Sequence, residues 1–228
     1  MNLDIDRIQA ICFDVDGTLR DTDDQYMYRF AGWLRPFRAV LPQQDELAAA
    51  RWLVMFLETP GNWVYGLPDL LHIDHHIANA KKLFGIGQNK AHQYLLIDGI
   101  PDMLEKIADR YPLAVVSARG RQGTLGFLNT FGLTPYFSVM VTALTTRRTK
   151  PRPDPILWAA MQMNIAPQHI LMVGDTVVDI KAGKAAGCQT VGVLCGFGTE
   201  QELRKAGADL ILPSTADLPE LLFSPSSA

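Results

Sequence analysis

The chain has 228 residues, of which 48% are hydrophobic and 20% charged, a balance typical of a globular protein with one large domain or a core carrying a smaller insert. A formal net charge of −3 gives no electrostatic reason to expect nucleic acid or an anionic membrane as a partner. The three cysteines are odd in number and lack CxxC spacing, which argues against a disulfide framework and favours reduced thiols in a cytoplasmic protein.

The amino-terminal segment MNLDIDRIQA is acidic and mixed, so we expect no signal peptide. The longest apolar stretch, residues 47–57, is interrupted by Arg51 and is too short to span a bilayer. We therefore expect no membrane partner.

The first predicted strand, at residues 11–13, runs directly into Asp14 and Asp16. Two carboxylates two residues apart lie on the same side of the pleat, and they raise each other's pKa unless a cation or a proton lies between them. Gly17 lets the backbone turn sharply and leaves room for a ligand. The pattern indicates a divalent metal beside a carboxylate nucleophile. A strand that merely ends in a polar turn is the alternative, and this string alone does not decide between them.

The stretch from 21 to 97 contains helical patterns and no convincing strand. Pro42, a Thr-Pro-Gly run at 59–61 and two glycines at 85 and 87 separate its segments. We interpret it as a helical cap domain of residues 21–97, inserted into a core of residues 1–20 and 98–228. The expected helices are 24–40, 44–58, 69–84 and 89–96.

Helical spacing resumes at Pro101, and from Tyr111 onward short apolar runs alternate with amphipathic helices. Continuous apolar strands separated by helices predict an α/β fold, a Rossmann-like parallel sheet with helices on both faces. In such sheets ligands bind beyond the carboxyl ends of the strands. The expected strands are 113–116, 137–141, 170–173, 190–194 and 210–212, and the expected helices between them are 121–131, 153–163, 177–186 and 200–206.

Polar residues follow several of these strands. Ser117 can offer a hydroxyl to a phosphate, Lys150 supplies positive charge from a proline-rich loop, and Asp175 and Asp179 lie one helical turn apart. Each has an ordinary alternative: a turn or capping serine, a solvated lysine, and carboxylates that compensate a helix dipole. These alternatives do not explain why all four residues lie at strand ends of one sheet, together with the two aspartates of the first strand.

Four motifs in order now resemble those of the haloacid-dehalogenase-like hydrolase superfamily: FDVDGT, Ser117 in VVSA, Lys150 in KPRPDP, and GDTVVD. The resemblance extends from Ile8 to about Leu212. The helical insert is similar to the family's type I cap, and the carboxyl-terminal run from Gly196 to Asp209 is most similar to the phosphoglycolate-phosphatase branch.

The resemblance implies a Mg²⁺-dependent phosphatase. In that mechanism Asp14 attacks phosphorus to form an aspartyl-phosphate, and Asp16 protonates the leaving alcohol and then deprotonates the attacking water. Mg²⁺ would be held by the Asp14 carboxylate, the Asp16 main-chain carbonyl and Asp175. Gly17 and Thr18 would shape the loop.

Ser117 and Lys150 would bind the phosphoryl oxygens, with Asp179 pairing with Lys150. The expected substrate is a small-molecule phosphate monoester, with phosphoglycolate as the best single guess. The sequence predicts no oligomeric state.

Three questions stay open. Asp16 favours phosphoryl transfer over dehalogenation, but a phosphosugar mutase shares the same core, and a catalytically silent binding module shares the same fold. Arg20, where relatives usually carry an apolar residue, either binds a substrate anion or is simply solvated. Arg119, in a segment where many relatives have an asparagine, either alters how the phosphate loop is braced or reaches the substrate.

Overall fold

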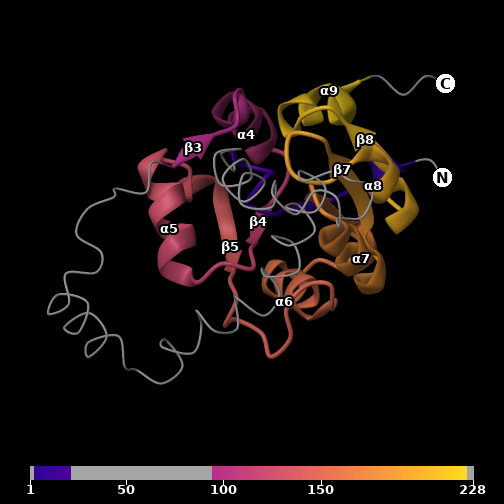
Figure 1. Cartoon of the computed structure of the whole chain (residues 1–228), viewed down its shortest axis with the longest axis horizontal. Coiled ribbons are helices and arrows are strands. Elements are labelled where there is room, and N and C mark those ends of the chain that lie inside the picture. The colour runs from indigo at the N-terminus through magenta and orange to yellow at the C-terminus, as the bar shows by residue number, and fades with distance from the viewer. Residues whose placement is uncertain (1–2, 22–93, 225–228) are drawn as a thin grey trace, which may run out of the picture. The chain divides into compact units, whose positions relative to one another are not determined.

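Figure 1 shows the computed structural model of the chain, which describes residues 3–21 and 94–224. The chain divides into two units, residues 1–21 together with 94–228, and residues 22–93. Every described residue therefore belongs to the first unit. The expected helical cap lies almost wholly outside the described residues and stays a prediction.

Six parallel strands form the sheet, in the order β5-β4-β1-β6-β7-β8. The central strand β1 pairs with β4 on one side, where Ile11 lies opposite Leu113, and with β6 on the other, where Ile11 lies opposite Leu171. The predicted parallel sheet is confirmed, and each predicted strand agrees with the structure to within one residue at either end. The strands are β1 (Ala10–Phe13), β4 (Leu113–Val116), β5 (Phe137–Val141), β6 (Ile170–Gly174), β7 (Gln189–Val193) and β8 (Leu210–Leu212).

Helices connect these strands, and their starts follow local capping chemistry. Helix α7 begins with a capping box in which Thr176 and Asp179 satisfy each other's backbone N–H groups, and it ends at Gly187, which has a φ of +85°. Among residues 3–21 and 94–224, no helix combines the length and the apolar content needed to cross a bilayer. The helices are α4 (Ile100–Ala108), α5 (Arg121–Thr130), α6 (Asp154–Met163), α7 (Val177–Ala186), α8 (Glu200–Ala206) and α9 (Leu218–Phe223), with 3₁₀ turns at Ile5–Arg7, Thr134–Tyr136, Pro167–His169 and Thr215–Asp217.

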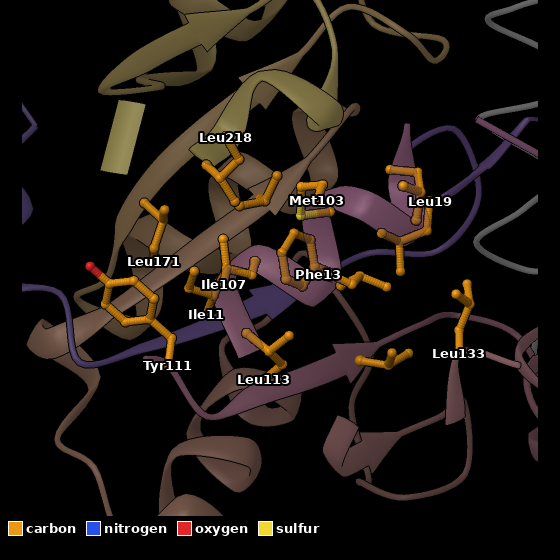
Figure 2. Packing of buried hydrophobic residues seen from close by; sticks show 14 of the residues in the cluster. Ile11, Phe13, Leu19, Met103, Ile107, Tyr111, Leu113, Leu133, Leu171 and Leu218 are labelled. Carbon is orange, nitrogen blue, oxygen red and sulfur yellow. The ribbon is translucent and has the colours of Figure 1, made fainter. Parts of the chain in front are cut away.

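The pleat of β1 divides its side chains between two apolar clusters. Ile11 and Phe13 face a cluster that includes residues of α4, α5 and α9, and Figure 2 shows Phe13 beside Met103 and Ile107 of α4. Ala10 and Cys12 face a second cluster, which includes residues of α6 and α7. Successive side chains of a strand point to opposite faces, so an unbroken apolar strand requires helices on both sides. The structure has them, and Cys12 is a buried core residue.

Two elements differ from the sequence expectation. Leu95 and Leu96, expected at the end of a helix over 89–96, instead form strand β3 (Leu95–Leu96), which pairs antiparallel with β2 (Arg20–Asp21). Two residues are too short for any periodic pattern, so this pairing left no signal. Helix α9 is also absent from the elements expected from the sequence. It places Leu218 and Leu222 in the protein core.

Candidate active site

The site begins at the carboxyl end of the central strand. The Asp14 backbone N–H donates to the Val173 carbonyl at 3.0 Å, which places the residue directly beyond the strand pair β1–β6. Asp14 is 7% exposed. Burial raises the pKa of Asp14 to about 7, and the Lys150 ammonium group opposes that rise. A buried carboxylate in this position needs a cation beside it to stay ionised.

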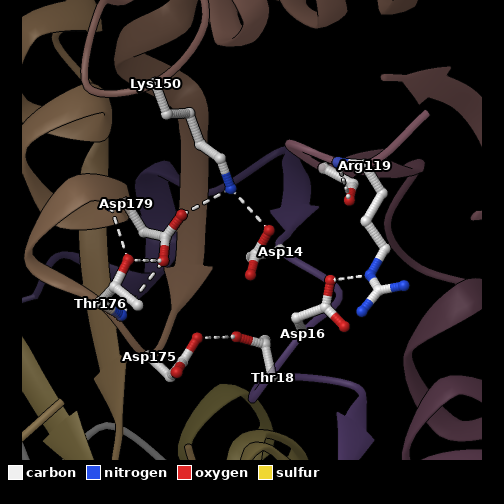
Figure 3. Close-up of polar contacts among 9 residues, drawn as sticks. Asp14, Asp16, Thr18, Arg119, Lys150, Asp175, Thr176 and Asp179 are labelled. Carbon is white, nitrogen blue, oxygen red and sulfur yellow. Dashed lines mark hydrogen bonds and ion pairs between the residues drawn. The ribbon is translucent and has the colours of Figure 1, made fainter. Parts of the chain in front are cut away.

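Lys150 supplies such a cation. Its Nζ lies 2.6 Å from Asp14 Oδ1 and 2.6 Å from Asp179 Oδ1, so one ammonium group bridges two carboxylates that are far apart in the sequence (Figure 3). Burial alone lowers the pKa of Lys150, but the charges of Asp14 and Asp179 outweigh burial and the pKa is raised. The two carboxylates therefore favour the charged form of Lys150, and the solvated alternative for it is wrong, because the residue is buried.

Asp179 serves two purposes at once. Its Oδ2 accepts hydrogen bonds from the Thr176 backbone N–H at 3.1 Å and from the Thr176 hydroxyl at 2.5 Å, which completes the cap of α7. Its Oδ1 accepts from Lys150. The capping interpretation and the lysine-partner interpretation of this residue are both correct, because the two oxygens have different partners. Asp175, however, precedes the helix instead of sharing its first turn.

Asp175 lies in a close-fitting enclosure of backbone. Its Oδ1 accepts from the Thr18 hydroxyl at 3.1 Å and its Oδ2 from the Phe197 backbone N–H at 2.8 Å. A Cβ atom at Gly17 or at Gly196 would overlap the Asp175 carboxylate, and Gly17 also has a φ of +78°. Burial raises the pKa of Asp175 well above its usual range, and the neighbouring Asp179 and Asp14 raise it further.

The carboxylates of Asp14, Asp175 and Asp179 could hold a divalent cation. Each offers an oxygen within 4.8 Å of the others, and all three residues are buried. Carboxylate oxygens are the donors that Mg²⁺ prefers. Among the described contacts, Asp14 accepts only through Oδ1, from Lys150, and Asp175 accepts only from uncharged donors, the Thr18 hydroxyl and the Phe197 N–H. Asp179, in contrast, both caps α7 and binds the Lys150 ammonium group, so Asp14 and Asp175 are the better placed ligands. The donor set, its burial and the glycine enclosure therefore fit Mg²⁺.

The Asp16 side chain belongs to a different group of contacts. Its Oδ1 accepts from Arg20 Nη1 at 3.0 Å. Its Oδ2 accepts from Arg119 Nε, as Figure 3 shows. Arg20 is only 9% exposed, and its guanidinium lies 5.2 Å from the centre of the Tyr94 ring. The solvated interpretation of Arg20 is therefore wrong. The expected metal contact of the Asp16 main-chain carbonyl and the expected acid–base role of this residue stay predictions.

Ser117 follows β4 and is 5% exposed. Its backbone N–H donates to the Val141 carbonyl at 2.9 Å, and its hydroxyl accepts from the Arg119 backbone N–H at 3.1 Å. Arg119 thus contacts Ser117 through its backbone and Asp16 through its side chain. Arg119 was expected either to change how the phosphate loop is braced or to reach the substrate. The hydrogen bond from its backbone to Ser117 is a contact within that loop.

Sequence reasoning missed several contributors to the site. The Phe197 N–H and the close approach of Gly196 hold Asp175, and Thr176 holds Asp179. The glycine-rich turn after β7 was the sequence signal for Gly196 and Phe197. The signal for Thr176 was its place three residues before Asp179, the spacing of a capping box. The Asp16–Arg119 ion pair had no local signal, because it joins segments 103 residues apart.

Comparison with known proteins places the chain among relatives of similar length. It is 29% identical to a phosphoglycolate phosphatase of Escherichia coli O157:H7, covering 96% of this chain and 94% of the relative. It is 28% identical to the pyrophosphatase PpaX of Bacillus pumilus, covering 92% and 94%. A crystal structure described as a predicted phosphoglycolate phosphatase from Haemophilus somnus 129PT has a TM-score of 0.67 and 25% identity, covering 94% of this chain and 98% of that one.

The family model described as haloacid dehalogenase-like hydrolase matches residues 11–193, a span from β1 to the end of β7. All four predicted motifs lie within that span, and their carboxylates and lysine meet at one edge of the sheet. The chain belongs to the haloacid dehalogenase-like hydrolase family.

Proposed function

We propose that this protein is a Mg²⁺-dependent phosphatase that hydrolyses a small-molecule phosphate monoester through an aspartyl-phosphate. The observation that carries the proposal is the placement of Asp14 at the end of the central strand, with Lys150 on one of its oxygens and Asp175 close by. The relatives named phosphoglycolate phosphatase and the related crystal structure support phosphoglycolate as the first substrate to test.

Asp14 is the proposed nucleophile. A carboxylate attacks phosphorus only in its ionised form, and the Lys150 charge favours that form in a buried site. Lys150 remains bonded to Asp179, so its position does not depend on Asp14 alone. It can therefore hold a phosphoryl oxygen while Asp14 reacts.

Bound at Asp14 and Asp175, Mg²⁺ would neutralise clustered carboxylates and a dianionic phosphoryl group. The residues of this chain do the remaining work. Ser117 offers its hydroxyl to the phosphoryl group, and Asp16 exchanges a proton with the leaving oxygen and then with water. Thr18 and Phe197 keep Asp175 in a fixed orientation through their hydrogen bonds.

The test is release of inorganic phosphate from phosphoglycolate, pyrophosphate and a generic aryl phosphate, with Mg²⁺ and with a chelator in its place. We expect release that requires the metal and that disappears in Asp14→Asn, while the circular dichroism spectrum of the variant matches the parent. Near-normal turnover by Asp14→Asn would exclude Asp14 as the nucleophile. The absence of phosphate release with any divalent metal would exclude a phosphatase.

Neither alternative of the same fold releases net phosphate, so analysis of the products formed from a sugar phosphate separates them. A phosphosugar mutase would convert a sugar phosphate to its isomer without net release of phosphate. A binding module would bind a phosphate ester without changing it. Intact candidate residues at all four motifs support an enzyme over a binding module.

A further inference from the structure

Two arginines converge on the carboxylate of Asp16, one on each oxygen. Arg20 Nη1 lies 3.0 Å from Oδ1, and Arg119 Nε pairs with Oδ2. Neither arginine is part of the proposed machinery of phosphoryl transfer. Their convergence on the residue proposed to protonate the leaving group needs its own explanation.

The two arginines differ in exposure. The Arg20 side chain is 11% exposed and stacks near the Tyr94 ring, whereas the Arg119 side chain is 38% exposed. A buried side chain held on two sides keeps its position, while a half-exposed one can change partners at low cost. Arg20 can therefore anchor Asp16 while Arg119 turns to another anion.

Arg119 also has a defined place relative to the expected substrate. Its backbone N–H donates to the hydroxyl of Ser117, the expected phosphoryl-binding residue. Its guanidinium reaches Asp16, as Figure 3 shows. The guanidinium thus lies on the side of the site where the leaving alcohol is expected. A guanidinium carries five N–H donors in a planar fork that matches a carboxylate.

A further donor at this cluster lacks an acceptor. Within the described part of the chain, Nε of Arg20 is buried and has no hydrogen-bond partner. A buried unpaired donor is costly, so the position of Arg20 is maintained by its other contacts, the ion pair with Asp16 and the Tyr94 ring, as expected of a side chain that anchors Asp16.

We propose that Arg119 binds a second anionic group of the substrate, a carboxylate on the carbon that carries the phosphate ester, while Arg20 keeps Asp16 in position. This inference rests on the proposed function and names the substrate class within it. The substrate carboxylate takes the place of Asp16 on Arg119, so the arrival of the correct substrate releases one oxygen of Asp16 toward the leaving group. Arg119 is then a specificity-determining residue and Arg20 a positioning residue.

The test compares phosphoglycolate with its amide, in which a neutral carboxamide of the same shape replaces the carboxylate. We expect the parent protein to prefer phosphoglycolate in kcat/KM by about 10- to 100-fold, the effect of one hydrogen-bonded charge pair. Arg119→Gln should bring this ratio close to one, mainly by raising KM for phosphoglycolate, and Arg119→Lys should recover part of the preference because the charge remains.

Arg20→Gln should give a different signature. It should lower kcat on both esters by a similar factor and leave their ratio near the parent value, and Arg20→Lys should recover part of kcat. Arg204→Gln is the matched control, since Arg204 is exposed and pairs only with Glu200 among the contacts described for it. If Arg20→Gln fails to fold, the half-exposed Arg119 variants still decide the proposal.

A binding measurement separates this inference from the proposed function. Titration calorimetry of Asp14→Asn with each ester needs no turnover, and we expect tighter binding of phosphoglycolate, with the difference removed by adding Arg119→Gln. Retained discrimination after Arg119→Gln, or equal binding of both esters before it, would overturn the inference even if the protein is a phosphatase. Discrimination that depends on Arg119 without any phosphate release would overturn the proposed function alone.

Discussion

The ammonium group of Lys150 lies 2.6 Å from Oδ1 of Asp14, and both residues are buried. Removing one partner of a buried ion pair leaves an uncompensated charge, which typically costs about 3–5 kcal/mol. We expect Lys150→Ala to lower the free energy of unfolding by about that amount and to abolish phosphate release. Urea unfolding in a chelator measures the first effect. Lys205→Ala, in an exposed part of α8, is the control, and an equal change in both variants would contradict the prediction.

The glycine enclosure around Asp175 leads to a second prediction. Because a Cβ at residue 196 would overlap the Asp175 carboxylate and the Gly17 carbonyl, Gly196→Ala should displace that carboxylate and weaken Mg²⁺ binding by at least about 10-fold. The Mg²⁺ dependence of phosphate release measures the effect.

Gly123→Ala, in α5, is the matched control for this substitution. A Cβ there meets open space, so the change should leave the Mg²⁺ dependence as it is and stabilise the fold by about 0.5–1 kcal/mol through helix propensity. An unchanged metal response in Gly196→Ala would show that Asp175 is not a ligand or that the loop yields without cost.

Asp209 provides a prediction about pH. Burial alone raises the pKa of Asp209, but hydrogen bonds from Lys184 and Thr190 outweigh burial and the pKa is lowered. A carboxyl group with a lowered pKa in the folded state stabilises that state above its unfolded pKa of about 3.9, and the contribution is lost as the pH falls through the folded value.

The loss of free energy of unfolding caused by Asp209→Asn should therefore be largest at neutral pH, about 1–3 kcal/mol, and should shrink in acid below about pH 4. Urea unfolding of both proteins across this range measures the difference, with the exposed Glu105→Gln as a control. A difference that grows in acid would have the wrong sign.

Helix α9 yields a prediction that the sequence alone did not suggest. Leu218 is completely buried and belongs to the same apolar cluster as Phe13. Leu218→Ala should therefore lower the free energy of unfolding by about 2–5 kcal/mol. The same substitution at Leu157, which is 42% exposed on α6, should cost much less. Comparable losses at the two positions would mean that α9 does not pack on the sheet in solution.

The sheet was predictable because its strands are short, mostly apolar runs whose length and flanking turns are local properties, even though β5 contains Ser138 and β7 begins with Gln189 and Thr190. The residues at its carboxyl edge were predictable for a related reason: parallel strands bring Asp14, Ser117 and Asp175 to one edge whatever the details of packing. The same argument could not assign individual oxygens. Asp179 caps a helix with one oxygen and binds Lys150 with the other. This division depends on where the Lys150 loop lies in the folded protein, which the local sequence does not give.

Arg20 shows most clearly which property the local sequence could not predict, the burial of a charged side chain. Its residue type favours a solvated side chain, and its neighbours in the sequence give no contrary signal. Burial follows from Tyr94 and from the turn that brings Asp16 back toward β2, and neither is encoded by periodicity. The short strands β2 and β3 could not be predicted from local sequence either, because their pairing joins residues more than 70 positions apart.

That pairing has an evolutionary consequence. Asp21 lies opposite Leu95, so the chain leaves the core and returns to it at neighbouring positions on two hydrogen-bonded strands. Whatever lies between residues 22 and 93 can lengthen, shorten or be exchanged without rerouting the sheet or moving the carboxylates at its edge. The β2–β3 pairing thus holds the two ends of segment 22–93 together on the core, apart from the strands that carry Asp14 and Asp175.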